Sequence, residues 1–319
     1  MPGARCYGPA TMQTLVTGGA GFIGSHLVDA LVESGHGVRV LDDVSTGHRE
    51  NVHQDAELLV GSLADADAVR RAVAGVEVVF HLGALGAVAR SVEDPRTCDE
   101  VNVHGALTVL TLSRDAGVRR VVFASSSSVY GGATIVPTPE TVPPQPRSPY
   151  AVSKLAGEWY TRVFAGLYEI ETVALRYFNV FGPRQRPDST YAAVIPLFTR
   201  ALLEGEHPTV FGDGLQSRDF TYVSDVVAAN LLGATTPADA VSGNVYNVAP
   251  GGGATLLDLL AALGEILGVT PDPIFTEARP GDIYQSCADA SAARRDLGWE
   301  PRVGFADGLA RYVDWLRPG

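Results

Sequence analysis

The segment that decides the fold runs Leu15-Val16-Thr17-Gly18-Gly19-Ala20-Gly21-Phe22-Ile23-Gly24. It ends a short apolar strand and opens a helix whose apolar side chains recur at helical spacing. Gly18 and Gly21 let the main chain turn tightly and approach a pyrophosphate, and Gly24 lets the helix pack close to the sheet. The helix N-terminus offers free N–H groups and a positive dipole end, so we expect a phosphate cradle here. The alternative is an ordinary tight turn.

Strand and helix patterns then alternate through the first half of the chain. Strands are predicted over residues 13–17, 38–41, 57–60, 78–81, 120–124 and 171–176, and helices over 22–33, 64–74, about 96–116 and 150–167. This alternation indicates βαβ units in a parallel sheet, and right-handed crossovers make such a sheet doubly wound. The predicted fold class is therefore α/β, with a Rossmann-type doubly wound parallel sheet and a smaller mixed α/β lobe.

The pattern loosens after Asn179, where prolines and glycines interrupt it. We place a dinucleotide-binding Rossmann domain at residues 1–178, to which the chain returns at about 216–240. A second, ligand-binding lobe is placed at residues 179–319, with helices expected over 256–267 and 306–316.

Composition excludes several function classes. The chain has 319 residues, is 46% hydrophobic and carries a net charge of −12, which argues against a nucleic-acid or anionic-membrane partner. It contains no apolar run near the ~18 residues that a membrane helix needs. Residues 1–11 lack the apolar stretch of a secretory signal, so we read them as an extension, with Met12 as a candidate natural start. Three scattered cysteines and seven scattered histidines predict no disulfide framework, no metal site and a cytoplasmic location.

Asp42 ends the second predicted strand, near the offset at which an acid binds the ribose of a dinucleotide. A carboxylate there accepts both ribose hydroxyls and repels a 2′-phosphate, which favours NAD over NADP as the cofactor. The nearby Arg49 weakens this preference, and a turn-forming aspartate at a strand end is the alternative interpretation.

Tyr150 and Lys154 are four residues apart on a predicted helix and therefore share a face. A phenol near pKa ~10 is a poor base, but a neighbouring ammonium and an oxidised nicotinamide would stabilise its anion and lower the pKa. Four serines, residues 125–128, end the fifth predicted strand, where a doubly wound sheet faces its ligand. One of these hydroxyls is expected to share a proton between substrate and Tyr150; the others cap and turn the chain.

Together these motifs resemble the extended short-chain dehydrogenase/reductases that act on nucleotide sugars, over about residues 13–315. The resemblance is closest to the UDP-glucose/UDP-N-acetylglucosamine 4-epimerases. Besides the motifs above, it rests on Phe80-His81-Leu82, Asn102, Ser125–Gly131, Arg176–Arg184, Tyr191–Pro196, Ser217–Phe220 and Arg279–Asp282.

The resemblance implies a role for individual residues. As catalytic residues it implies Ser126, Tyr150 and Lys154. For NAD it implies Gly18, Gly21, Phe22, Ile23, Gly24, Asp42, Asp43, Ser45, Thr46, Gly47, Ser62, Leu63, Leu82, Gly83, Ala84, Asn102, Tyr150, Lys154 and Tyr177. For a UDP-sugar it implies Ser127, Asn179, Ala193, Val194, Phe211, Arg218, Arg279, Asp282 and Ser286. It also implies a homodimer formed by the helices from about Arg96 and Tyr150.

Two departures from the family pattern bear on the reaction. A 4,6-dehydratase of this family would carry Asp and Glu at positions 127 and 128, and a decarboxylase would typically keep the Glu, whereas this chain has Ser at both. The resemblance therefore favours a 4-epimerase of UDP-hexoses. Ser62 replaces the acid that usually reaches the adenine, so this contact is expected to be weaker.

The small Ser286 side chain is expected to leave room for an N-acetyl group at carbon 2, so we expect activity on UDP-GlcNAc as well as UDP-glucose. Alternatives stay open at this point. They are a UDP-glucuronate 4-epimerase, suggested by the run from Arg184 to Asp188, a 5,6-dehydratase, and a non-catalytic NAD-sensing regulatory protein.

Overall fold

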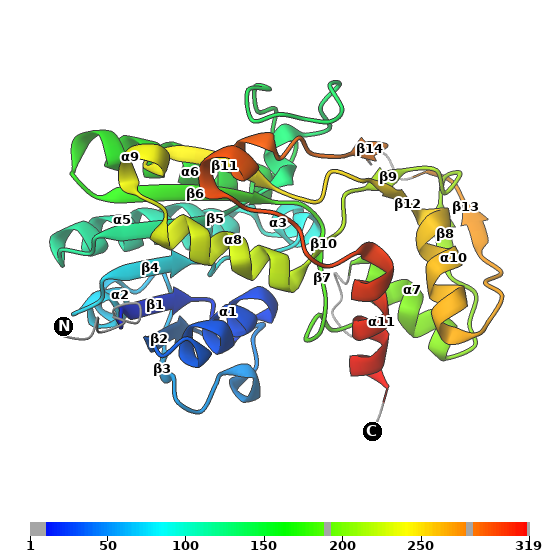
Figure 1. Cartoon of the computed structure of the whole chain (residues 1–319), viewed down its shortest axis with the longest axis horizontal. Helices are drawn as coiled ribbons and strands as arrows, with labels where there is room; N and C mark the ends of the chain where they lie inside the picture. The colour runs from blue at the N-terminus through cyan, green and yellow to red at the C-terminus, as the bar shows by residue number, and fades with distance from the viewer. Residues whose placement is uncertain (1–10, 188–192, 279–282, 318–319) are drawn as a thin grey trace, which may run out of the picture.

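The computed structural model describes residues 11–187, 193–278 and 283–317. Its centre is a seven-stranded, wholly parallel sheet in the order β11-β6-β5-β4-β1-β2-β3 (Figure 1). The strands are β1 (Gln13–Thr17), β2 (Gly37–Asp42), β3 (Glu57–Val60), β4 (Val78–His81), β5 (Arg120–Ser126), β6 (Glu171–Tyr177) and β11 (Asn244–Val248). The predicted fold class is confirmed.

Helices cover both faces of this sheet. They are α1 (Phe22–Glu33), α2 (Ala66–Val73), α3 (Val88–Glu93), α4 (Pro95–Asp99), α5 (Gly105–Asp115), α6 (Pro149–Leu167), α8 (Val223–Thr235) and α9 (Ala238–Val241). Short 3-10 or π segments are η1 (Arg49–Asn51), η2 (Glu100–His104), η3 (Ser127–Tyr130) and η4 (Ala293–Leu297).

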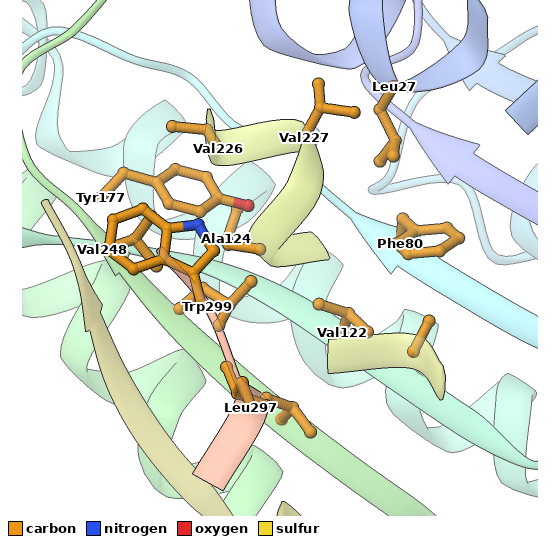
Figure 2. Close-up of a cluster of buried hydrophobic side chains, with 14 of the residues drawn as sticks. Leu27, Phe80, Val122, Ala124, Tyr177, Val226, Val227, Val248, Leu297 and Trp299 are labelled. Carbon is orange, nitrogen blue, oxygen red and sulfur yellow. The ribbon is translucent and has the colours of Figure 1, made fainter. Parts of the chain in front are cut away.

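Successive strand residues enter two separate cores, because side chains alternate across a sheet. Leu15 and Val121 pack with α2, α5 and α6. Val16 and Val122 pack with α1 and α8 on the opposite face. Figure 2 shows part of this second core, where α8 places Val226 and Val227 among Leu27, Phe80, Val122, Ala124, Tyr177, Val248, Leu297 and Trp299.

The second lobe lies beyond the carboxyl ends of the strands, at the right of Figure 1. Its helices are α7 (Val194–Leu203), α10 (Leu256–Leu267) and α11 (Phe305–Leu316), and its short strands are β7 (Val180–Phe181), β8 (Thr209–Phe211), β9 (Ser217–Arg218), β10 (Thr221–Tyr222), β12 (Ala254–Thr255), β13 (Ile274–Thr276) and β14 (Gln285–Ser286). Its apolar core also receives Phe22 and Ile23 from α1, so the two parts of the molecule share packing. None of the described helices is long and apolar enough to span a membrane.

The structure differs from the predicted elements in two places. The helix expected over about 96–116 consists of α4, the π segment η2 and α5, with the buried Asn102 inside η2. Strand β11 was not predicted, because its two asparagines disfavour strands in isolation; pairing with β6 and burial decide its conformation. The division into a domain of residues 1–178 and a lobe of residues 179–319 stays a prediction.

Candidate active site

A cleft of about 320 Å³ opens where β1, β2, β4, β5 and β6 end. It brings together most residues predicted to bind a dinucleotide: Gly18, Gly21, Phe22, Ile23, Gly24, Asp42, Asp43, Ser45, Thr46, Leu63, Leu82, Gly83, Ala84, Tyr150, Lys154 and Tyr177. These residues come from six separate parts of the chain, and the sheet topology places them at one edge.

The turn between β1 and α1 has the geometry of a phosphate cradle. Gly18 has φ +72°, and a Cβ added to it would lie 2.7 Å from the main chain of Gly83. A Cβ added to Gly24 would lie 2.1 Å from the Gly18 carbonyl oxygen. Gly21 is the N-cap residue of α1, and no described side chain caps this end of the helix. The first N–H groups of α1 are therefore available to a pyrophosphate, and these residues fit a bound dinucleotide.

Asp42 lies in this cleft at the end of β2, held by two main-chain donors. Its Oδ2 accepts a hydrogen bond from the Ala20 N–H at 2.9 Å, and its Oδ1 accepts one from the Val44 N–H at 2.8 Å. Burial raises the pKa of this carboxyl, and the two N–H donors oppose that shift. Each carboxylate oxygen retains acceptor capacity for a ribose hydroxyl. Arg49 is exposed in η1 and lies outside the cleft lining, so it does not compete with Asp42 there.

Tyr150 and Lys154 begin α6, and local bonds fix their position. Ser148 caps the helix by accepting a hydrogen bond from the Ala151 N–H, and the Tyr150 N–H donates to Ser91 Oγ at 3.1 Å. Lys154 Nζ donates to the Ala124 carbonyl at 2.9 Å and lies 5.9 Å from the centre of the Tyr150 ring. The predicted pair therefore shares one face and lines the cleft.

The pKa of Tyr150 differs in direction from the sequence-based expectation. Burial raises the pKa of the phenol above its usual value, and interaction with the Ser126 hydroxyl opposes this shift. Burial also lowers the pKa of Lys154 to about 8. A lowered Tyr150 pKa was expected with both the ammonium and an oxidised nicotinamide beside it, whereas desolvation of the phenolate is the largest influence on this pKa in the structure.

The serines at and after the end of β5 make different contacts. Ser126 interacts with the Tyr150 phenol and also accepts a hydrogen bond from the Ser128 N–H at 3.1 Å. Ser125, which was not singled out, lines the cleft and donates to Glu158 Oε1 at 2.5 Å. Ser127 belongs to η3 and lines neither of the two clefts described here.

A buried polar chain supports this end of β5. Glu158 lies four residues beyond Lys154 on α6 and pairs with Arg176 on β6, with Nη2–Oε2 at 2.7 Å. Arg176 also donates to the Tyr130 hydroxyl at 2.7 Å, and that hydroxyl donates to Asn247 Oδ1 at 2.8 Å. Sequence reasoning missed Glu158, although its i, i+4 spacing from Lys154 was a readable signal.

A second cleft of about 490 Å³ lies in the other lobe. It brings together five residues that the resemblance implied for a UDP-sugar: Asn179, Ala193, Val194, Phe211 and Arg218. It begins close to the first cleft, since Asn179 follows Tyr177 by two residues and Val88 follows the 82–86 loop that lines the first cleft. Gln185 and Gln216 also line it; Gln185 lies in the run from Arg184 to Asp188, whereas no motif had pointed to Gln216.

Several predicted residues lie outside both clefts. Gly47 packs against Ala20 behind the cradle, and the Ser62 hydroxyl accepts a hydrogen bond from the Ala64 N–H. Asn102 supports the first cleft from behind, with Oδ1 accepting from the Leu85 N–H at 2.7 Å. Ser286 lies on β14, paired in register with Arg218. Arg279 and Asp282 fall outside the described residues.

The geometry defines a class before any comparison: a dinucleotide-binding α/β protein with a Tyr–Lys pair at the cofactor cleft and a second ligand cleft beside it. The chain belongs to the NAD dependent epimerase/dehydratase family, whose model matches residues 14–249. The expected resemblance is thereby confirmed.

Individual relatives match over nearly the whole chain. UDP-glucose 4-epimerase of Mycolicibacterium smegmatis is 42% identical over 313 residues, 96% of this chain and 99% of its own. The crystal structure of UDP-glucose 4-epimerase from Thermotoga maritima with UDP-glucose has a TM-score of 0.91 at 40% identity, covering 95% of this chain and 98% of that one. UDP-N-acetylglucosamine 4-epimerase from Methanobrevibacter ruminantium, in complex with UDP-N-acetylmuramic acid, has a TM-score of 0.91 at 39% identity, covering 96% and 98%.

Proposed function

We propose that this protein is an NAD-dependent 4-epimerase of UDP-hexoses, acting on UDP-glucose and UDP-galactose and on their N-acetylated forms. The observation that carries the proposal is the placement of the Tyr150 phenol, beside Ser126 and Lys154, in a dinucleotide cleft that adjoins a second ligand cleft. Family membership and the named relatives support the same activity.

In this proposal the protein binds and orients the substrate and the cofactor, and its side chains move one proton. Bound NAD would accept a hydride from carbon 4 of the hexose and return it. Tyr150 takes the proton of the 4-hydroxyl, assisted by the Ser126 hydroxyl, and gives it back to the ketone oxygen. Lys154, held by the Ala124 carbonyl, supplies positive charge near the phenol and a donor for the nicotinamide ribose. No proton is gained or lost overall.

The alternatives to 4-epimerisation find less support. Loss of water or carbon dioxide needs an acid or base where this chain has Ser127 and Ser128, and a hydroxyl performs neither task efficiently. A glucuronate substrate would need a free cation in its pocket. Arg184 instead pairs with Asp29 on α1 at 2.7 Å, and Arg186 lies 3.7 Å from Glu50.

For the substrate we assign the second cleft to the UDP group. Arg218 would bind the diphosphate, Phe211 would lie near the uracil, and Asn179 would contact the sugar diphosphate. Ser286, beside Arg218 in the sheet, would form the wall at carbon 2 of the hexose. Arg279 and Asp282 would complete the site at the phosphates and the uridine ribose. The remaining predicted residues, Ser127, Ala193 and Val194, are assigned to the same substrate.

We further propose a cytoplasmic homodimer without nucleic-acid or membrane partners. An apolar stripe on α6 supports the dimer: Val152, Trp159, Val163 and Leu167 are 52%, 54%, 45% and 69% exposed. Their spacing places them on one face of the helix, and a second copy would cover it. The acidic net charge of −12 agrees with the proposed lack of polyanionic partners.

Purified protein incubated with UDP-GlcNAc, with no NAD added, tests the activity. Resolution of the products by NMR should show UDP-GalNAc, and a parallel reaction with UDP-glucose should show UDP-galactose. Tyr150→Phe should bind NAD and UDP as before but turn over at least 100-fold more slowly, the lower range for loss of an acid-base group. Conversion of UDP-glucuronate alone, or unchanged turnover by Tyr150→Phe, would refute the proposal.

A further inference from the structure

Asp219 is a buried carboxylate for which the proposed reaction has no use. It is 1% exposed and lies between Arg218 and Phe220, both of which line the second cleft. Asp219 is not part of that lining; it borders a separate cavity of about 430 Å³ together with Pro250, Gly252 and Gly253. A buried charge is retained in a fold when several donors satisfy it, so the donors of Asp219 indicate its role.

The Asp219 side chain ties three segments of the second lobe together. Both of its oxygens lie 3.1 Å from the Gly251 N–H, and Oδ2 accepts a hydrogen bond from the Ala288 N–H at 2.9 Å. The Cys287 thiol also donates to it. In addition, the Asp219 main-chain oxygen lies 3.4 Å from Asn179 Nδ2. Hydrogen bonds to an ionised carboxylate are stronger than those between neutral groups.

These segments carry the residues assigned to the UDP-sugar. Strand β9 pairs with β12 on one side and with β14 on the other, so Arg218 lies in register between Ala254 and Ser286. The Ala288 and Gly251 N–H groups, which donate to Asp219, lie close to these paired residues in the sequence. Ala288 is two residues beyond Ser286, and Gly251 is three residues before Ala254. β9 and β14 are only two residues long. Such short strands contribute few ladder bonds, so the hydrogen bonds of the Asp219 carboxylate are a substantial share of those that join these segments.

We propose that Asp219 is a positioning residue, whose carboxylate clamps β14 and the 250–253 loop onto β9 and so sets the spacing between the phosphate-binding Arg218 and the sugar-facing Ser286. This inference rests on the proposed function of the second cleft. The selectivity between hexoses would then depend on the Asp219 carboxylate, although that carboxylate does not contact the hexose.

Asp219→Asn tests the clamp, because Asn keeps the shape but turns one acceptor oxygen into an NH2 group that meets the N–H donors. We expect the KM for UDP-glucose and the Kd of UDP alone to rise roughly tenfold, as for loss of a charged hydrogen bond, with kcat within about threefold of wild type. The ratio of kcat/KM for UDP-GlcNAc to that for UDP-glucose should shift at least threefold. The NAD content of the purified protein should be unchanged.

Asp225→Asn is the matched control. Asp225 is also buried and accepts two main-chain hydrogen bonds, from the Arg302 and Val303 N–H groups at 3.0 and 3.2 Å, but Asp225 and the two donor residues line neither cleft. This variant should lose stability with KM and selectivity unchanged. If Asp219→Asn does not yield folded protein, Cys287→Ala, which removes one donor from the same carboxylate, should raise the KM two- to threefold.

The clamp is refuted if Asp219→Asn leaves KM and the Kd of UDP within twofold of wild type. It is equally refuted if the selectivity ratio does not move, or if Asp225→Asn produces the same rise in KM. Failure of the proposed function looks different: wild-type protein would then convert no UDP-hexose. The Kd of UDP would still report on the clamp in that case.

Discussion

Lys154 Nζ donates a hydrogen bond of 2.9 Å to the Ala124 carbonyl oxygen, across the gap between α6 and the end of β5. This bond holds a buried ammonium beside Tyr150 in a setting that disfavours its charge, since burial lowers the pKa of Lys154 to about 8. The site thus retains a cation that costs folding stability, which is expected where the charge serves a bound ligand rather than the fold.

Replacement of this lysine separates stability from activity. Lys154→Met should raise the free energy of unfolding at pH 7 by about 1–3 kcal/mol in protein stripped of nucleotide, while abolishing epimerisation. The folded-state pKa is depressed, so the penalty is full below pH 8 and fades as pH rises toward 10.5, where the unfolded chain also loses the proton. Urea unfolding from pH 7 to 10.5 should show the two proteins converging. A Met variant less stable than wild type throughout would contradict this account.

The cradle should fail when its first glycine acquires a side chain. Gly18→Ala combines an unfavourable φ of +72° with a Cβ 2.7 Å from Gly83, so the purified protein should carry little NAD, as measured by ultraviolet absorbance of released nucleotide. Gly35→Ala is the control, because Gly35 has φ +79° but an added Cβ would meet no atom within 4 Å. It should lose about 1 kcal/mol of stability and keep its NAD. Equal NAD loss in both variants would show that backbone strain, not the cradle, is responsible.

The buried His81 side chain should make the folding stability of the protein sensitive to acid. Burial, reinforced by Lys154, lowers its pKa from 6.5 to about 3, and its Nδ1 lies 2.8 Å from the Thr17 hydroxyl. The folded state therefore holds a neutral imidazole that the unfolded chain protonates. Its contribution to stability is complete above pH 6.5 and falls by up to about 1.4 kcal/mol per pH unit below it.

Chemical unfolding between pH 7 and 4 should show this decline, and His81→Asn should flatten it. An unchanged slope in the variant would assign the acid sensitivity to other groups.

The buried pair of Arg176 and Glu158 should behave as a unit. Both side chains are about 5% exposed or less, so Arg176→Met should cost about 3–5 kcal/mol by leaving a buried carboxylate without its partner. The double variant with Glu158→Leu should recover much of this loss, because no charge then remains buried. Arg295 is the exposed comparison, since it pairs with Asp296 at 2.7 Å in contact with solvent: Arg295→Met should leave stability nearly unchanged. If a double-mutant cycle showed no coupling energy between Arg176 and Glu158, the claim that they act jointly would be refuted.

Much of the fold was predictable because its signals are local. The cradle from Gly18 to Gly24 and the pair of Tyr150 and Lys154 depend on spacings within one or two turns, and the structure places each where these spacings indicate. Most other residues that line the first cleft follow from the parallel sheet, because the carboxyl ends of its strands converge. Strand β11 was missed since its partner β6 lies about 70 residues earlier.

The sequence by itself determined the glycine-rich turn, the α/β class and the pairing of Tyr150 with Lys154 on one helix face, since covalent neighbours and helical spacing specify these. Only the tertiary structure decided that Ser125 lines the first cleft, that burial raises the Tyr150 pKa, and that Asp219 accepts a hydrogen bond from the Ala288 N–H. The physical reason is that burial and long-range hydrogen bonds arise from segments distant in the chain, whose mutual placement no local pattern encodes.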